Sequence, residues 1–328
     1  MSAFSRDVLR IDAAAECERI VGFIRDRLAG MKRRGLVVAL SGGVDSSVVG
    51  ALAVRALGAE RVFGLLLPER ESSQETRLLG DRIVAELGIR HVLEDITPLL
   101  DAAGCYRRRD DAIASAVPGY DKRWRCKVVL PPVLDSDRYR LSEVIARSPQ
   151  GLEVRARLGA QAYLEVVAAT NFKQRCRKML EYHHADRLGY AVAGTPNLAE
   201  YDLGFFVKLG DGAADVKPIA HLYKTQVYAI AQHLGVPDEI RRRTPTTDTY
   251  SLAQTQEEFY FSLPYDLTDL CLFARRHAIP EEIAAPVLGL DVEQVRRVFR
   301  DLDGKRAVAR YLHLEPQVIA REAERRAL

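Results

Sequence analysis

The first hundred residues of the chain alternate between helix-like and strand-like segments, and this alternation restricts the possible folds. Apolar residues recur at helical spacing in residues 12–34, and the apolar run 36–40 follows Gly35. The alternation continues with a helix pattern ending at Gly58, a strand pattern at 61–68, a helix pattern from a Ser72 and Glu75 capping box to near Gly88, and a strand pattern at 90–96. This order predicts an α/β fold with a doubly wound, Rossmann-like parallel sheet, whose ligand sites lie beyond the carboxyl ends of the strands.

Residues 101–157 interrupt the alternation. Short strand-like runs are separated there by Pro-Pro, Asp-Ser-Asp and Ser-Pro-Gln-Gly turn signals, so we interpret the segment as a mostly β insertion. Regular alternation resumes with a long helix from about Ala160 to Leu188, and the residues after Leu263 look helical. The sequence therefore predicts one large domain over 1–270, with the β-rich insertion at about 101–157, and a helical C-terminal extension over 271–328.

The segment between the strand pattern 36–40 and the next helix has the composition of an anion site. It reads Ser41, Gly42, Gly43, Val44, Asp45, Ser46, Ser47. Glycines let the backbone approach an oxyanion, the hydroxyls add donors, and a helix N-terminus offers free N–H groups at its positive end. Asp45 suits such a site if it holds a divalent cation shared with a phosphate. The alternative is a helix start with Gly and Ser caps and no ligand.

This loop differs from a Walker P-loop because it lacks the Gly-Lys-Ser/Thr ending. It resembles the SGGxDSS loop of the N-type ATP pyrophosphatases, a group with the adenine nucleotide alpha hydrolase-like fold. The resemblance implies that ATP is cleaved between its α and β phosphates, which leaves AMP on a substrate and releases pyrophosphate.

Six further blocks resemble the ammonia-dependent NAD synthetase family in order and spacing. They are NFKQRCR from Asn171, GTPNLAE from Gly194, GFFVK from Gly204, GDGAAD from Gly210, LYKTQ from Leu222 and PTTD from Pro245. With the first loop, the likeness covers residues 35 to about 96 and 160 to about 270. It implies an ATP-dependent amide ligase that adenylates the nicotinate carboxylate of deamido-NAD, after which ammonia displaces AMP to give NAD.

The resemblance assigns roles to single residues of this chain. Asp45 and Glu200 are implied as magnesium ligands, and hard oxygen donors suit magnesium that bridges ATP phosphates. ATP contacts are implied for the loop residues 41–47, Thr195, Lys224 and Thr246, and deamido-NAD contacts for Asn171, Arg175, Lys208 and Asp215. Lys224, and Asp45 through the magnesium that it holds, are then implied in catalysis, because they neutralise charge at the phosphates. We add Asp211 as the carboxylate that accepts the proton of the attacking amine.

Two departures from the family leave the acid acceptor open. Pro196 stands where the family has Gly or Ser, and the family's C-terminal His-Lys pair is not visible after Gly304. The insertion adds roughly 35 residues relative to the short members of the family. One alternative is therefore the same adenylate-forming amidation of a different carboxylic acid, and another is a nucleotide-binding regulator without catalysis. The joint presence of Asp45, Glu200 and Lys224 argues against the regulator.

Composition restricts the partners. The formal charge is +3, from 48 basic and 45 acidic residues, so we expect no nucleic acid partner. The runs Arg107–Arg109 and Arg241–Arg243 are expected to be solvated faces. The five cysteines are scattered, and no apolar stretch is long enough to span a membrane, so we expect a cytoplasmic location and no membrane partner.

The nitrogen source follows from what the chain does not contain. A nitrilase-type glutaminase would add a few hundred residues, and an N-terminal-nucleophile glutaminase needs a cysteine where Ser2 stands. We therefore expect the chain to use free ammonia or to receive it from a separate protein. The family resemblance also implies a homodimer whose interface helps to form the deamido-NAD site.

Overall fold

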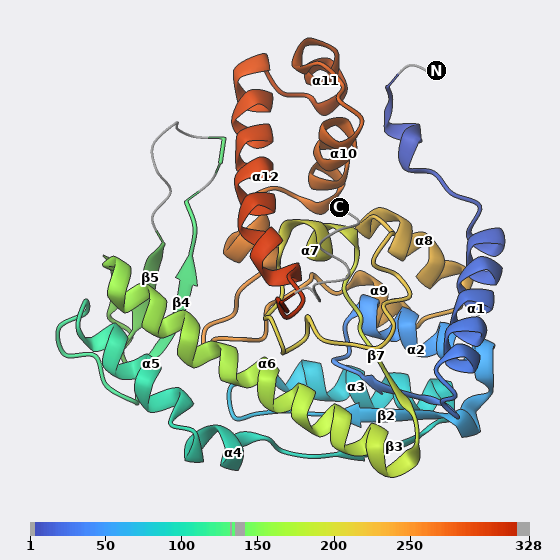
Figure 1. The fold of residues 1–328 in the computed structure, drawn as a ribbon. Coiled ribbons are helices and arrows are strands. Elements are labelled where there is room, and N and C mark those ends of the chain that lie inside the picture. The colour runs from blue at the N-terminus through green and yellow to red at the C-terminus, as the bar shows by residue number, and fades with distance from the viewer. Residues whose placement is uncertain (1–3, 132, 135–141, 320–328) are drawn as a thin grey trace.

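The computed structural model, which describes residues 4–131, 133–134 and 142–319, contains a four-stranded parallel sheet, seen at the lower right in Figure 1. The strand order is β3-β2-β1-β7. The strands are β1 (Leu36–Ala39), β2 (Val62–Leu66), β3 (Arg90–Leu93) and β7 (Ala191–Ala193). All three neighbouring pairs are parallel. The predicted α/β class with a parallel sheet is confirmed.

Helices cover both faces of this sheet. Strand β1 alternates between two cores, since Leu36 and Val38 belong to one and Val37 to the other, all fully buried. The first core is closed by α1 (Ala13–Gly30), α2 (Val44–Leu57), α3 (Gln74–Leu87) and α8 (Lys224–His233). The second is closed by α4 (Thr97–Ala102), α5 (Cys105–Ala114) and α6 (Ala160–Leu188). The sheet is therefore doubly wound, as predicted.

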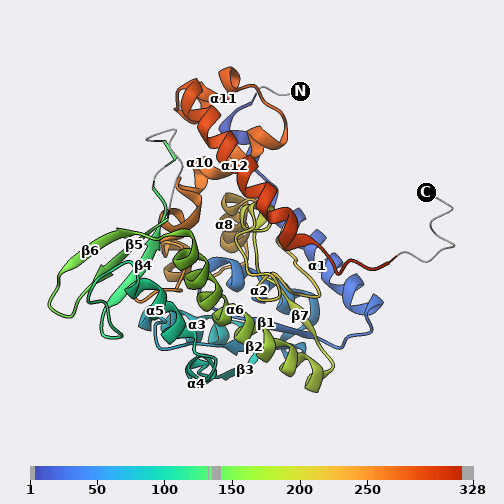
Figure 2. The ribbon, with the colours of Figure 1, turned by 60° about the vertical axis from the view of Figure 1, so that its left-hand side comes forward.

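The predicted insertion contains a separate antiparallel sheet. It consists of β4 (Arg125–Val129), β5 (Glu143–Arg147) and β6 (Glu153–Arg157), in that order (Figure 2). Its earlier part is helical rather than β, because Tyr106, Arg109 and Ile113 recur at helical spacing and bury one face of α5. Residues 132 and 135–141 of the predicted insertion lie outside the described residues.

Helices also form the C-terminal region, in agreement with the sequence. The elements α10 (Tyr265–Arg276), α11 (Glu281–Leu288) and α12 (Val292–His313) share a core with α7 (Leu198–Leu203) and the short η1 (Arg6–Leu9). Three short elements complete the list, η2 (Ala59–Arg61), α9 (Asp238–Arg242) and the π-helical η3 (Glu257–Phe261). The predicted boundary at residue 270 between the large domain and the C-terminal extension stays a prediction. The last residues of the predicted extension, 320–328, lie outside the described residues.

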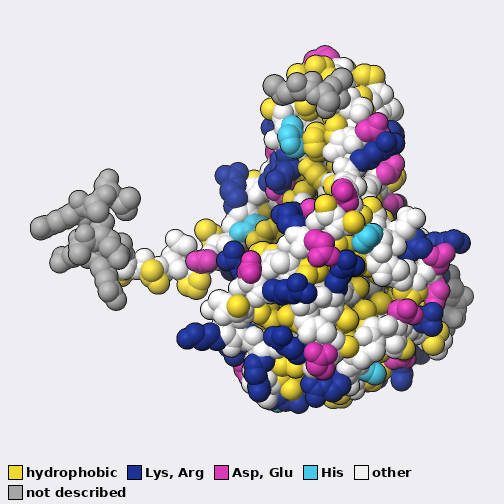
Figure 3. Space-filling model, turned by 90° about the vertical axis from the view of Figure 1, so that its right-hand side faces the viewer, with side chains coloured by type: hydrophobic (Ala, Val, Ile, Leu, Met, Phe, Trp, Pro, Cys, Tyr) yellow, Lys and Arg dark blue, Asp and Glu magenta, His cyan; other side chains and the backbone are white. Residues whose placement is uncertain are grey.

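The surface carries both signs of charge. Basic and acidic side chains are interspersed over the face seen in Figure 3, as the near balance of the two in the sequence suggests. Among the described residues, no helix combines the length and the apolar character that crossing a membrane requires.

Candidate active site

The glycine-rich loop joins β1 to α2 at the carboxyl end of the sheet. Gly42 has a φ of 70°, and a Cβ at this position would lie 2.7 Å from the Leu79 Cβ and 2.9 Å from the Gly80 nitrogen. Both the left-handed backbone and the close approach of α3 therefore require glycine here. Gly43 is the N-cap residue of α2 and has extended backbone geometry.

The loop hydroxyls hold the turn together. Ser46 and Ser47 donate to the carbonyl of Gly43 at 3.1 and 2.8 Å, and the hydroxyls of Ser41 and Ser46 lie 3.2 Å apart. Within the described chain, no side chain caps the N-terminus of α2. Its first N–H groups, at the positive end of the helix dipole, are therefore free to bind an anion.

Three charged side chains meet beside this loop. Lys224, at the start of α8, is only 1% exposed and forms an ion pair with Asp45. Asn197 donates from its side chain to the other Asp45 oxygen at 3.2 Å, and its backbone N–H donates to Glu200 at 3.1 Å. The N-terminal ends of α2, α7 and α8 thus bring together residues that lie far apart in the sequence.

Burial and mutual charge set the protonation of this cluster. Burial, with the nearby Asp45 carboxylate, raises the pKa of Glu200 to about 8. Burial alone would lower the pKa of Lys224, but the carboxylates of Asp45 and Glu200 outweigh it and raise that pKa. Two repelling carboxylates beside the N-terminus of α2 suit a divalent cation, and magnesium commonly binds one or two carboxylates plus substrate phosphates.

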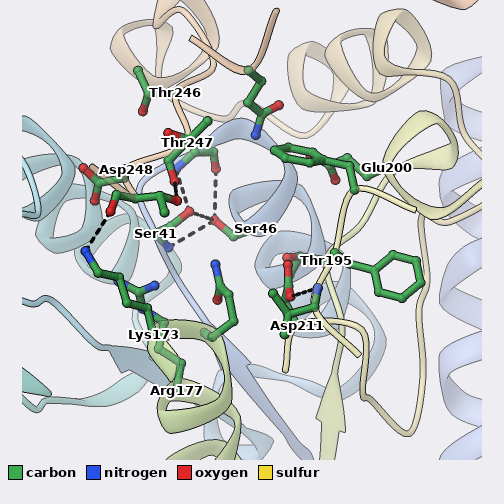
Figure 4. A pocket seen from close by; sticks show the side chains of 18 of the residues that line it. Ser41, Ser46, Lys173, Arg177, Thr195, Glu200, Asp211, Thr246, Thr247 and Asp248 are labelled. Atoms are coloured by element: carbon green, nitrogen blue, oxygen red, sulfur yellow. Dashed lines mark hydrogen bonds between the residues drawn. The ribbon is translucent and has the colours of Figure 1, made fainter. Parts of the chain in front are cut away.

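A cavity of about 480 Å³ opens at this end of the sheet (Figure 4). It runs from the glycine-rich loop to Val128 and Leu130 of the antiparallel sheet region. The predicted site residues that line it are Ser41, Gly43, Asp45, Ser46, Asn171, Thr195, Glu200, Asp211 and Thr246. Most of the ATP and metal residues expected from the sequence therefore face one cavity.

Other predicted residues do not line the cavity. Gly42, Val44 and Ser47 shape the loop behind it, and Lys224 contacts it through Asp45. Arg175 donates to the Lys208 carbonyl at 3.4 Å, and the Lys208 ammonium lies 3.0 Å from the Tyr311 carbonyl. Asp215 accepts from the Val192 N–H of β7 at 2.7 Å. The substrate roles of Arg175, Lys208 and Asp215 stay predictions.

Asp211 lies deep in the cavity wall. Its carboxylate accepts from the Val207 N–H at 2.7 Å, and burial raises its pKa although this hydrogen bond and Lys178 oppose the shift. Lys178 forms a 2.6 Å ion pair with Glu181 alongside. A carboxylate with a raised pKa is a better proton acceptor near neutrality, which is compatible with the predicted role of Asp211.

Several cavity residues were not predicted. We expected the runs Arg107–Arg109 and Arg241–Arg243 to be solvated, but the last residue of each run, Arg109 and Arg243, is largely buried. Arg243 lines the cavity and donates to the Thr76 hydroxyl at 2.7 Å, whereas Arg109 pairs with Glu71 at 2.6 Å. Lys173 also lines the cavity, in the middle of the block NFKQRCR. Only this block pointed to it, and charge runs alone cannot tell a buried arginine from a solvated one.

Known proteins resemble this chain along most of its length. The NAD synthase family model matches residues 16–126 and 139–307. The NH(3)-dependent NAD(+) synthetase of Rhizobium meliloti is 56% identical over 316 residues, which cover 96% of this chain and 95% of the relative. The protein of the same name from Thermotoga neapolitana is 37% identical and covers 76% of this chain and 80% of the relative.

Solved structures resemble the fold. An NH3-dependent NAD synthetase from Campylobacter jejuni, in complex with the nitrate ion, has a TM-score of 0.61 at 22% identity and covers 95% of this chain and all of that chain. An NMN synthetase from Francisella tularensis has a TM-score of 0.64 at 21% identity and covers 94% of this chain and 99% of that chain. At these identities the likeness shows the fold alone. The family match and the two close relatives show more, and this chain belongs to the NAD synthase family.

Proposed function

We propose that the chain is an ammonia-dependent NAD synthetase that uses ATP to convert deamido-NAD to NAD. The observation that carries this proposal is the 56% identity to the NH(3)-dependent NAD(+) synthetase of Rhizobium meliloti along 96% of the chain. The cavity beyond the carboxyl ends of β1 and β7 supports it, because its loop, carboxylates and lysine suit ATP and a divalent cation.

The first step joins the nicotinate carboxylate to AMP. A carboxylate oxygen attacks the α-phosphate, the bond to the β-phosphate breaks, and pyrophosphate leaves. Because substrate and ATP are both anionic, the site has to neutralise their repulsion. The N-terminus of α2 and Lys224 offer positive charge for the phosphates, and Thr246 offers a hydroxyl donor from the cavity wall.

Magnesium is the cation that we propose for Asp45 and Glu200. Held there, it would supply positive charge that neutralises the phosphate oxygens and so reduces their repulsion of the attacking carboxylate. The ion pair with Lys224 and the hydrogen bond from the Asn197 side chain orient Asp45, and the Asn197 backbone N–H orients Glu200. Glu200 must lose its proton to bind magnesium. The affinity for magnesium should therefore rise as the pH approaches the Glu200 pKa of about 8.

The second step forms the amide. Neutral ammonia attacks the acyl carbon of the adenylate, AMP leaves, and one proton from the nitrogen has to be accepted. Asp211 is the carboxylate that we propose for this proton, since it lines the cavity and burial raises its pKa. Ammonia enters from solution or from a separate protein.

The remaining assignments extend the same proposal. Asn171 faces the cavity and is proposed to bind deamido-NAD there, whereas Arg175, Lys208 and Asp215 lie outside it. We propose that these three contact deamido-NAD at the interface of a homodimer in the cytoplasm. The proposed partners are ATP, deamido-NAD and ammonia, without nucleic acid or membrane.

Pyrophosphate release with a panel of acids tests the proposal. The purified chain is incubated with ATP, magnesium and ammonium, and with deamido-NAD, nicotinate mononucleotide or simple carboxylic acids in turn. Deamido-NAD should give the highest kcat/KM, and Asp45→Asn should abolish the release. A higher kcat/KM with another acid would move the chain to the alternative acceptor, and no release with any acid would leave only nucleotide binding.

A further inference from the structure

Strand β4 is an edge strand of the antiparallel sheet, and the loop 244–256 covers its free edge. On its other side β4 pairs with β5. The loop contacts are Leu252 N to Cys126 O at 3.0 Å, Cys126 N to the Ser251 hydroxyl at 2.8 Å, Arg125 Nε to Ser251 O at 2.8 Å, and the Gln254 amide to Val128 O. Edge groups that would otherwise lack partners are thereby satisfied by the loop.

Side chains of this loop are part of the core of the antiparallel sheet. Tyr250 is 5% exposed and packs in the cluster that contains Cys126 and Val128, and Leu252, also 5% exposed, packs against Val129 and Ile145. The limb 250–254 is therefore anchored to the sheet by burial as well as by hydrogen bonds.

The other limb of the same loop lines the cavity. Thr246 forms an antiparallel bridge with Thr255, and Thr246, Thr247 and Asp248 face the cavity (Figure 4). The Thr247 N–H donates to the Gln254 carbonyl at 3.2 Å, and the Thr247 hydroxyl donates to the Gln254 side-chain oxygen at 3.2 Å. Gln254 thus joins β4 to the cavity-facing limb.

Gln254 has the environment of a side chain that fixes a position. It is 4% exposed, its amide nitrogen donates to β4 and its amide oxygen accepts from Thr247, so both ends are engaged. A buried amide with both ends satisfied specifies one arrangement, because any other would leave a polar group without a partner.

We infer that the antiparallel sheet β4–β6 serves ATP binding by holding Thr246 in place through Gln254, which is a positioning residue. The inference rests on the proposed function, since ATP is taken as the ligand that Thr246 contacts. A limb that is already ordered loses less conformational freedom when ATP binds, and this raises affinity without a new contact. The inserted sheet thereby has a role in ATP binding, although Val128 is the one residue of its three strands that lines the cavity.

Calorimetric titration of ATP, with magnesium, tests this in the full-length chain. Gln254→Met keeps the side-chain volume but removes both hydrogen bonds, and it should raise the ATP Kd about 10-fold, the effect of about 1.4 kcal/mol. The matched control is Glu153→Gln on β6, which disrupts only the exposed pair with Arg147 and should leave the Kd unchanged. An unchanged Kd in a folded Gln254→Met chain would overturn the inference.

A double-mutant cycle separates positioning from general stability. If Gln254 acts through Thr246, the double variant Thr246→Ala/Gln254→Met should have an ATP Kd less than about 2-fold above that of Thr246→Ala alone. Full additivity would overturn the role assigned to Gln254. If Gln254→Met fails to fold, Thr247→Val is measured instead. It should raise the ATP Kd about 3-fold, and an unchanged ATP Kd would contradict the inference.

Failure of the proposed function would look different. A chain that binds ATP with the expected Gln254 effect but makes no NAD would contradict the proposed acid acceptor and leave this inference standing. A chain that makes NAD while Gln254→Met and Thr247→Val bind ATP normally would contradict only the inference.

Discussion

Replacement of Lys173 by Met should destabilise the chain by about 3 kcal/mol, because it leaves a buried carboxylate without a cation. Lys173 is 1% exposed, and its ammonium lies 2.8 Å from Glu69, 2.6 Å from Glu71 and 2.7 Å from the Thr249 carbonyl. Removing one partner of a buried ion pair typically costs about 3–5 kcal/mol. We expect the lower end, because only one of the two carboxylates loses its charged partner.

That carboxylate belongs to Glu69. Glu71 keeps Arg109, whose guanidinium donates to both of its oxygens at 2.7 and 2.6 Å. Glu69 keeps neutral donors, the Tyr106 hydroxyl at 2.7 Å and the Glu71 N–H at 3.0 Å. Adding Glu69→Gln to Lys173→Met should therefore restore about 1–2 kcal/mol.

Urea unfolding measures both values. Far-ultraviolet circular dichroism and the fluorescence of Trp124, the single tryptophan, should give coincident transitions if unfolding is two-state. The control is Arg107→Met on the exposed face of α5, which should change the unfolding free energy by less than about 0.5 kcal/mol. A double variant that is less stable than Lys173→Met alone would show that Glu69 is not the carboxylate left without a cation.

Three further predictions concern protonation, metal and substrate. Burial raises the pKa of Asp269 from 3.8 to about 6, so protonation of Asp269 favours the folded state. The unfolding free energy of Asp269→Asn should therefore increase by up to about 3 kcal/mol relative to that of the parent as the pH rises from 4 to 7. A difference in urea unfolding that does not change with pH would contradict this. Glu200→Gln should need more magnesium for pyrophosphate release, with partial rescue by excess magnesium, and an unchanged magnesium dependence would speak against Glu200 as a ligand. Lys208→Ala should raise the KM for deamido-NAD about 10-fold with little change in ATP binding, and an unaltered KM would remove Lys208 from the substrate site.

The part of the site that the sequence predicted depends on local patterns. The loop from Ser41 to Ser47 follows a buried strand and starts a helix, so its place at the carboxyl end of the sheet could be expected from periodicity and glycine content. Family blocks added Glu200 and Lys224, which the fold brings to Asp45. In these cases a short stretch of sequence determines both the residue and its position.

Contacts between distant segments could not be predicted in this way. Lys173 lies more than 100 positions from its partners Glu69 and Glu71, and nothing in the local pattern marks it as buried. The cap of α3 is Ser73, which accepts from the Thr76 N–H at 3.1 Å, rather than the expected Ser72. Ser72 instead accepts from the Glu69 N–H at 3.1 Å, a turn contact that competes with helix capping.

The helix α5 shows why a polar composition misled the prediction for the insertion. Half of the residues of Cys105–Ala114 are charged, yet Arg109 is buried on the inner face of the helix because it pairs with Glu71. A paired arginine can occupy a core position, so hydrophobic periodicity underestimates such a helix.

Mass spectrometry of the product made with heavy-nitrogen ammonium tests whether the chain amidates deamido-NAD. The purified chain is supplied with ATP, magnesium, labelled ammonium and deamido-NAD, and a parallel reaction contains the Asp45→Asn chain. The proposed function predicts NAD that carries the label in its amide, equal amounts of AMP and pyrophosphate, and no product from Asp45→Asn. Release of pyrophosphate without labelled NAD, or labelled NAD from the Asp45→Asn chain at the parent rate, would contradict it.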